Sequence, residues 1–431
     1  MVMGMMSETP GEKLTDVLRI QVVTGAIDAL NREFQADLQK ETKREAVTDR
    51  TQALVTQALR KEGIAPTVRE MNDLVEDILR RVTGLGFLDL LLPPARTDLS
   101  EITIYSHGLI QVMKKGAVRW ETLDLKVPAS EVFRVFGLLV GLQSRALNEA
   151  TPVVYARLPP TRDNPGGGRI TLVHPVLASG EYPSVNLRLF ELKPVLPEWI
   201  VAQAALSREM MDFLGQEVGE GSRLLICGET RTGKTTLLSA LMNLLPAAWR
   251  IVMIEDPAEI WVDRPTVQTF EARLVPPGSE TASVSLADLV TVAMRSSPDY
   301  LVVGEVRDGH AAVAMISALM SGTSGCCTLH ARSPRHAFER LATLMGISEA
   351  IGEHDAYKAI VESIDLIVQI RILHDVRRIT SIVRVEKELR GGRPWYTPLF
   401  RFDENSPVEA PRWERVREGA VEHPVPGRKD D

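Results

Sequence analysis

The chain has 431 residues, of which 44% are hydrophobic and 25% are charged. This balance is typical of a soluble globular protein, and the length predicts two or three domains. The formal net charge of −7 disfavours a nucleic-acid-binding protein with a dominant basic face. No apolar run reaches the roughly 18 residues of a membrane-spanning helix, and no basic region followed by an apolar stretch opens the chain, so we expect neither a membrane span nor a secretion signal.

The three cysteines, Cys227, Cys326 and Cys327, all lie in or beside apolar runs. They form no Cys-x-x-Cys pair, which argues against a zinc ribbon or a disulfide framework. We therefore expect buried thiols in a reducing cytoplasm.

The spacing of apolar residues changes once in the N-terminal half of the chain. Residues 1–92 carry apolar residues at helical spacing in their second half, which predicts a helical N-terminal segment. From residue 99 apolar and polar residues alternate, as in antiparallel strands. Residues 93–192 are predicted to form a small α+β domain, with a helix over 132–142 and later strands at 153–158, 169–174 and 185–190.

The C-terminal half begins with residues 193–220, which predict a linker containing a helix. Over residues 221–402 short apolar strands alternate with helices, and this alternation predicts an α/β domain with a parallel sheet. Residues 403–431 are polar and proline-rich, and we expect them to be disordered.

The strongest motif is GETRTGKT, from Gly228 to Thr235. It fits the phosphate-loop pattern, since an apolar strand ends before it and a helix opens at Lys234. Glycines let the backbone N–H groups point at phosphate oxygens, Lys234 supplies an ammonium for the β- and γ-phosphates, and Thr235 offers a hydroxyl to Mg²⁺. The predicted nucleotide-binding residues are Gly228, Glu229, Thr230, Arg231, Thr232, Gly233, Lys234, Thr235 and Thr236.

Acidic residues follow two of the predicted strands. Glu255 and Asp256 end one strand, with Glu259 nearby, and Glu305 ends another. Because parallel strands end at one edge of the sheet, both groups should face the nucleotide. We assign Glu305 to the attacking water, and Glu255 and Asp256 to the Mg²⁺ side; the alternative is that these acids are solvated loop residues.

His330 ends a further strand rich in small residues, SGTSGCCTLH. Its expected place on the same sheet edge as Glu305 favours a sensing or water-positioning role over simple packing.

These segments together resemble the type II/IV secretion ATPase family, which includes the GspE-type and VirB-type secretion ATPases. GETRTGKTTLL resembles the GxTGSGKTTLL of that family, IEDPAEI resembles its acidic box, MRSSPDYLVVGEVRD resembles the segment with its unusual Gly-Glu, and TLHA resembles the end of its histidine box. The resemblance covers residues 75–402 and is nearest the CpaF-like branch of Tad-type pili, with the conjugation-type ATPases close behind.

The resemblance implies a RecA-like C-terminal domain that binds ATP and Mg²⁺, below a PAS-like small domain. In this family two arginines of the small domain reach the terminal phosphate, and the matching segments GGGRITLVHP and VNLRLF point to Arg169 and Arg188. Further candidates, for subunit contacts or nucleotide closure, are Arg273, Arg295 and Arg307. The resemblance also implies a homo-hexamer in the cytoplasm, at the inner membrane, that acts on a membrane platform protein.

The chain departs from the family pattern in three ways. Thr323 follows Gly322 where the histidine box usually opens Gly-His, His310 stands where Glu is frequent, and the zinc-binding tetracysteine of general-secretion members is absent. Two other functions therefore stay open: a DNA-translocating motor, including a conjugative DNA-transfer ATPase, and a nucleotide-gated scaffold with little turnover.

Overall fold

The computed structural model describes residues 16–34, 44–143, 145–190, 194–262, 264–273, 282–349 and 351–416. The chain divides into two compact units, residues 1–190 and residues 191–431. Among the helices in the described ranges, none combines the length and apolar character that a bilayer span requires.

The first unit opens with a helical bundle of α1 (Asp16–Phe34), α2 (Arg44–Lys61) and α3 (Val68–Thr83). Thr67 and Glu70 start α3 with a reciprocal pair of side-chain hydrogen bonds to each other's backbone N–H groups, a capping box. The bundle has its own apolar core, which includes Leu30, Leu59 and Ile78. The predicted helical character of this segment is thus confirmed for the residues described.

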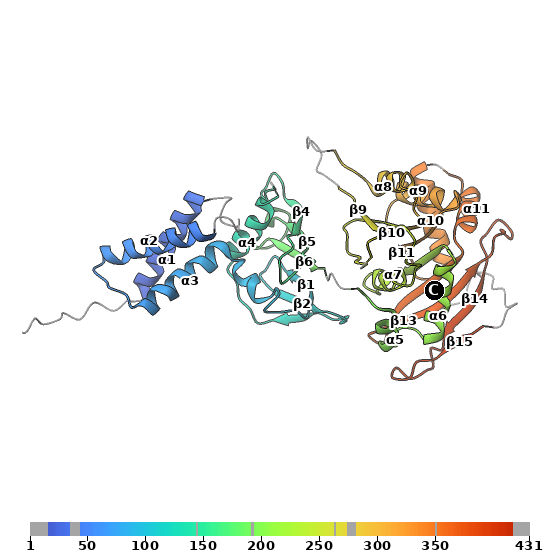
Figure 1. The fold of residues 1–431 in the computed structure, drawn as a ribbon, viewed down its shortest axis with the longest axis horizontal. Helices are drawn as coiled ribbons and strands as arrows, with labels where there is room; N and C mark the ends of the chain where they lie inside the picture. The colour runs from blue at the N-terminus through green and yellow to red at the C-terminus, as the bar shows by residue number, and fades with distance from the viewer. Residues whose placement is uncertain are drawn as a thin grey trace, which may run out of the picture. The chain divides into compact units, whose positions relative to one another are not determined.

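The rest of the first unit is an antiparallel sheet of order β3-β2-β1-β6-β5-β4 (Figure 1). Helix α4 (Ala129–Gly141) packs on one face of the sheet, and its Phe136 shares one buried core with Ile102 and Leu187 of the strands. The predicted helix and alternating strands are therefore confirmed. The bounds are η3 Gly86–Leu90, β1 Leu99–Ile104, β2 Ile110–Lys114, β3 Glu121–Leu123, β4 Val153–Leu158, β5 Gly168–Val173, η4 Pro175–Leu177 and β6 Ser184–Leu189.

The second unit is built on a sheet of order β15-β14-β13-β12-β7-β11-β10-β8-β9. From β12 through β7, β11, β10 and β8 to β9 the neighbouring strands are parallel, which confirms the predicted parallel sheet. The antiparallel strands β13, β14 and β15 extend the sheet beyond β12. The sequence pattern did not predict these three strands. The bounds are β7 Leu224–Gly228, β8 Ile251–Glu255, β9 Val267–Glu271, β10 Tyr300–Val306, β11 Ser324–His330, β12 Leu366–Leu373, β13 Val376–Val385, β14 Tyr396–Phe402 and β15 Trp413–Arg415.

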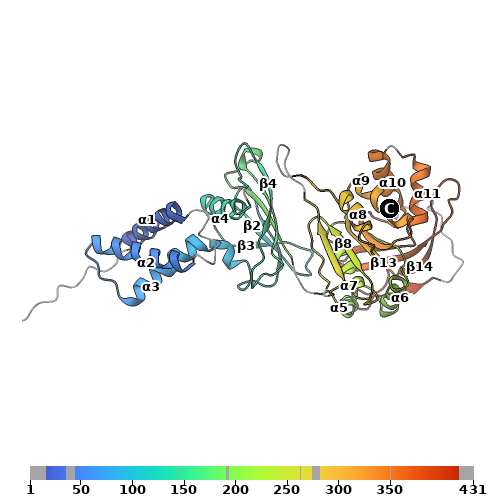
Figure 2. The same cartoon turned by 45° about the horizontal axis from the view of Figure 1, so that its top comes forward.

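Helices cover both faces of this sheet (Figures 1 and 2). Helices α8 to α11 bury one apolar core against the sheet, and α5 to α7 bury another. The central strands are buried on both faces, which explains why they read as short continuous apolar runs. The bounds are α5 Pro197–Ala202, α6 Arg208–Gly219, α7 Lys234–Met242, α8 Leu286–Met294, α9 Gly309–Met320, α10 Pro334–Glu349 and α11 Glu353–Ser363.

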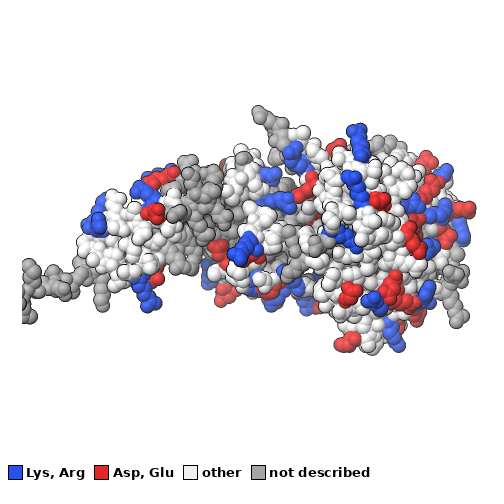
Figure 3. Space-filling view, in the orientation of Figure 1, with Lys and Arg blue, Asp and Glu red and all other residues white. Residues whose placement is uncertain are grey.

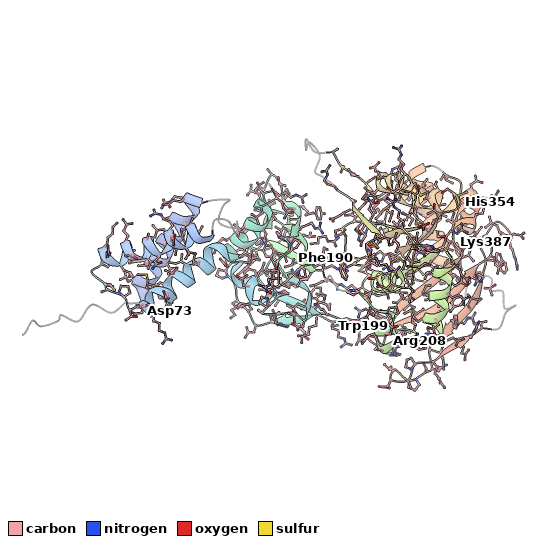
Figure 4. All side chains as sticks on the ribbon, in the orientation of Figure 1. Asp73, Phe190, Trp199, Arg208, His354 and Lys387 are labelled. Carbon is pink, nitrogen blue, oxygen red and sulfur yellow. The ribbon has the colours of Figure 1, made fainter. Side chains whose placement is uncertain are left out.

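Two sequence expectations need correction in this unit. The predicted linker contains α5 and α6, whose Ile200 and Leu214 are buried in the core of the second unit; Figure 4 labels Trp199 and Arg208 on these helices. The predicted disordered tail contributes β15, and Trp413 Nε1 donates to the Ile379 carbonyl at 2.7 Å. An amphipathic helix and an edge strand bury apolar faces that composition alone does not reveal. The remainder of that tail, residues 417–431, lies outside the described residues.

The edge of the sheet opposite the phosphate loop is fastened by a charged cluster at the start of β7 and β12. Asp365 accepts hydrogen bonds from the Arg223 backbone N–H at 2.8 Å, from the Arg223 guanidinium at 2.9 Å and from Lys387 Nζ at 2.6 Å. Lys387 is labelled in Figure 4. This cluster holds the strand that leads into the phosphate loop beside its neighbour β12.

Candidate active site

The phosphate loop connects the end of β7 to the start of α7. Gly233 precedes the helix with φ of +97°, and Arg231 has φ of +64°. A Cβ at Gly228 would lie 2.4 Å from the Ile370 carbonyl oxygen, so only glycine fits there. Gly233 has no side chain with which to cap the helix, so the first turn of α7 faces the loop as an anion-binding helix end. The predicted loop residues, 228–236, therefore have the strand–loop–helix arrangement that is typical of a phosphate-binding loop.

Lys234 is buried inside this loop. Its Nζ donates to the carbonyl oxygens of Gly228 at 3.1 Å and Glu229 at 2.8 Å. Nζ also lies 3.2 Å from Nδ1 of His330, which β11 delivers in register with Gly228. The lysine that would contact the phosphates is thus held by the carbonyl groups of the loop and by the predicted histidine.

Glu305 lies on the other side of His330. One carboxylate oxygen contacts His330 Nε2, and the other accepts from Arg307 Nε at 2.7 Å. Burial opposes ionisation of Glu305, but the hydrogen bond from His330 and the charge of Arg307 outweigh it and lower the pKa of Glu305 to about 2. Arg307 NH1 also donates to the Asp256 carbonyl at 3.1 Å. Lys234, His330, Glu305 and Arg307 therefore form one continuous polar chain across the sheet edge.

Glu255 is buried beneath the acidic box. One oxygen accepts from the backbone N–H groups of Glu259 at 2.9 Å and Ile260 at 3.0 Å. The other, Oε1, has no hydrogen-bond partner among the described residues. Burial is the main cause that raises the pKa of Glu255 to about 7. Its Cγ would lie 3.0 Å from a Cβ at Gly304, so the unusual glycine before Glu305 makes room for this side chain.

The described residues contain no group of three or more His, Cys, Asp or Glu side chains that could hold a metal ion. Mg²⁺ is usually bound through one or two protein groups together with substrate phosphates. Thr235, in the first turn of α7, and the half-buried Asp256 are the residues that fit this role. Glu255 fits it less directly, since one of its oxygens already holds the 259–260 backbone.

The predicted arginines lie at different places. Arg169 and Arg188 belong to the first unit, where β5 and β6 place them directly opposite each other. Their contact with a terminal phosphate stays a prediction. Arg273 pairs with Val284 in an isolated bridge, and Arg295 ends α8. Of these candidates in the second unit, Arg307 is the one that contacts Glu305.

Two of the three departures from the family pattern, Thr323 and His310, lie in the described part of the second unit. Thr323 precedes β11, at the opposite end of that strand from His330, and its hydroxyl is 3.7 Å from Met294 Sδ. His310 lies in the first turn of α9, which begins after Asp308. The missing histidine therefore does not remove the histidine that contacts Lys234.

Two residues near the site were not assigned a role from the sequence. Thr328 lies in the middle of β11, and its buried hydroxyl donates to the Gly304 carbonyl at 2.6 Å, next to Glu305. Arg377, 146 positions from the loop, donates from Nε to the Arg231 carbonyl at 3.1 Å. Only the strand pairing brings either residue to the site.

The parallel sheet, the glycine-capped loop and the acids at the same strand edge define a phosphate-loop domain with a RecA-like fold. Residues 170–391 match the family described as "Type II/IV secretion system protein", and the chain therefore belongs to this family.

Individual relatives agree with this placement. An uncharacterized protein of Methanocaldococcus jannaschii is 32% identical over 306 residues, which are 67% of this chain and 52% of that protein, so the chain spans about half the length of this relative. The type IV secretion system protein VirB11 of Bartonella quintana is 28% identical over 66% of this chain and 88% of its own length. The Yersinia pseudotuberculosis ATPase DotB, a crystal structure, is 19% identical with a TM-score of 0.50, and covers 72% of this chain and 79% of its own. The last similarity is one of fold.

Proposed function

We propose that this chain hydrolyses Mg-ATP as a hexameric motor on the cytoplasmic face of the inner membrane, where it powers type IV secretion or the assembly of a Tad-type pilus. One observation carries the proposal: the loop lysine, His330 and Glu305 lie in direct contact at the edge of a parallel sheet. The family membership and the VirB11 relative support the secretion role. The moved substrate would be pilin, an effector protein or a conjugative DNA complex.

Binding of ATP would start by exchanging the partners of Lys234. The β- and γ-phosphate oxygens replace the Gly228 and Glu229 carbonyls as acceptors, which frees His330 from the ammonium. Thr235 and an acid such as Asp256 would hold Mg²⁺, which would supply positive charge to neutralise the phosphates. The loop then presents its N–H groups and the helix dipole to the same oxygens.

Hydrolysis requires a water in line with the bond between the γ-phosphorus and the oxygen that bridges to the β-phosphate. Glu305 orients this water by accepting a hydrogen bond from it. A carboxylate with a pKa of about 2 is a weak proton acceptor, so Glu305 positions the water rather than removing its proton early. The water oxygen bonds to phosphorus, the bridging bond breaks, and the water proton ends on inorganic phosphate while ADP remains.

Arg169 and Arg188 would sense the γ-phosphate from the small domain. Both lie in register on neighbouring strands, so their side chains leave the same sheet face and can engage one anionic group. Loss of the γ-phosphate would remove their ligand, and a motor can couple this change of state to movement. Such a movement would push on an inner-membrane platform protein.

A DNA-translocating motor is less well supported. On the face of the second unit that Figure 3 shows, basic and acidic side chains are interspersed over the described residues rather than separated by sign. Translocation along DNA relies on contacts of basic residues with phosphates. Stimulation of hydrolysis by added DNA would favour this motor over the secretion role.

Phosphate release with Mg-ATP tests the enzymatic proposal. We expect Lys234→Ala to abolish turnover, and Glu305→Gln to retain ATP binding while turnover falls at least about a hundredfold. Glu339→Gln, the same change on α10, is the matched control and should keep full activity. Wild-type turnover no faster than that of the Lys234→Ala variant would instead support the nucleotide-gated scaffold.

The arginine proposal has its own test. Arg188→Ala should lower kcat more than it weakens ADP binding, since its ligand is the phosphate that ADP lacks. Arg134→Ala, on α4, is the control in the same unit. An equal effect on ADP binding and on turnover would remove Arg188 from the γ-phosphate.

A further inference from the structure

The hairpin of β12 and β13 lies beside the phosphate loop. Its two-residue turn, His374 and Asp375, has φ of +49° and +62°, as a tight twisted hairpin requires. Directly after the turn Arg377 reaches the loop, where its Nε donates to the Arg231 carbonyl at 3.1 Å. A Cβ at Gly233 would lie 3.3 Å from Arg377 Cδ, so the arginine stem also covers the last glycine of the loop.

The sheet order decides which part of a nucleotide this arginine faces. β7, which carries the loop, lies between β11 and β12. His330 and Glu305 are on the β11 and β10 side, and they mark the γ-phosphate end of the site. Arg377 comes from the β12 side. A nucleotide with its γ-phosphate toward Glu305 therefore extends its ribose and base toward Arg377.

The side chain has the chemistry for such a contact. A guanidinium is planar, stacks on aromatic rings and carries five N–H donors. Arg377 is half-buried, and burial lowers its pKa, although an arginine stays charged at neutral pH. Partial burial strengthens a cation–π contact, because less water competes with the ring.

We propose that Arg377 is a nucleotide-binding residue that contacts the adenine ring and ribose, and that it couples this contact to the loop through the Arg231 carbonyl. The inference rests on the proposed function, since it takes the same loop as a nucleotide site. It adds a recognition element for the nucleoside part, which inorganic polyphosphates lack.

The experiment compares two probes, ADP and inorganic tripolyphosphate, by calorimetry on the full-length chain. Arg377→Ala should weaken ADP binding about tenfold, the size of one cation–π and hydrogen-bond contact, and leave tripolyphosphate binding within about twofold. Arg377→Gln, which keeps the length and a donor but no charge, should show the same pattern if the alanine variant folds poorly. Arg371→Ala is the matched control, because Arg371 lies on the same hairpin and pairs with the exposed Glu404 at 3.2 Å.

The outcomes separate this inference from the proposed function. Equal weakening of both probes would mean that Arg377 only supports the loop, and unchanged ADP binding would mean that it contacts nothing in the nucleotide; either result overturns the inference. If the wild-type chain binds neither probe, the proposed function itself fails.

Discussion

Asp365→Asn should destabilise the second unit by a predictable amount. Asp365 accepts from Arg223 and Lys387, and although burial opposes ionisation, these partners lower the pKa of its carboxyl from 3.8 to about 2. A shift of almost two pKa units corresponds to about 2 kcal/mol of stabilisation of the charged form. Asparagine keeps the shape but loses the charge, so the free energy of unfolding at pH 7 should fall by about 2 kcal/mol.

The pH dependence gives an independent check on the same carboxylate. Because the folded-state pKa is depressed, the stabilisation is complete above about pH 4 and disappears as the pH falls toward 2. The wild type should therefore lose stability across this window, and the gap between wild type and Asp365→Asn should close.

The measurement is urea unfolding followed by tryptophan fluorescence at pH 7 and at several pH values below 4. Glu404→Gln is the control, because the ion pair of Glu404 with Arg371 is solvent-exposed and should contribute less than about 1 kcal/mol. If Asp365→Asn were as stable as the wild type at pH 7, the cluster would not fasten β7 to β12, and the reasoning would be refuted.

Three further predictions concern the site and the sheet edge. Burial raises the pKa of Glu255 from 4.5 to about 7, so the wild type loses stability as the pH rises between these values. The Glu255→Gln variant should therefore be up to about 3 kcal/mol more stable than the wild type at pH 8 and equally stable at pH 4. The same difference in unfolding free energy at both pH values would contradict this prediction. Thr328→Val removes the buried hydrogen bond to the Gly304 carbonyl, and should lower the free energy of unfolding by about 1–3 kcal/mol. It should also lower kcat. Unchanged turnover would mean that Thr328 does not help to position Glu305. Deleting residues 403–431, which include β15, should lower the melting temperature of the second unit, and an unchanged melting temperature would mean that β15 adds no stability.

The sequence predicts best where a local pattern and its chemistry coincide. The phosphate loop is visible because its glycines, lysine and threonine must stand at fixed spacing, and the flanking strand and helix follow from short apolar runs. The predicted meeting of Glu305 and His330 needs only the rule that parallel strands end at one edge, and the structure places them in contact.

The misses have a common physical cause. Arg377, Thr328 and the strands after β12 depend on pairing between distant segments, which single-chain periodicity does not encode. The burial of Glu255 was missed as well, since it depends on the chain turning back over β8 so that two backbone N–H groups meet one carboxylate oxygen.

The grip of the loop carbonyls on Lys234 has a consequence for exchange of nucleotide. The carbonyl oxygens of Gly228 and Glu229 compete with a bound phosphate for Lys234, since a ligand has to replace them before its own oxygens reach the ammonium. The apparent affinity is the intrinsic affinity multiplied by the fraction of molecules in which the lysine is released. The two carbonyl groups would rebind Lys234 as ADP begins to dissociate, and this rebinding would raise the rate of ADP release.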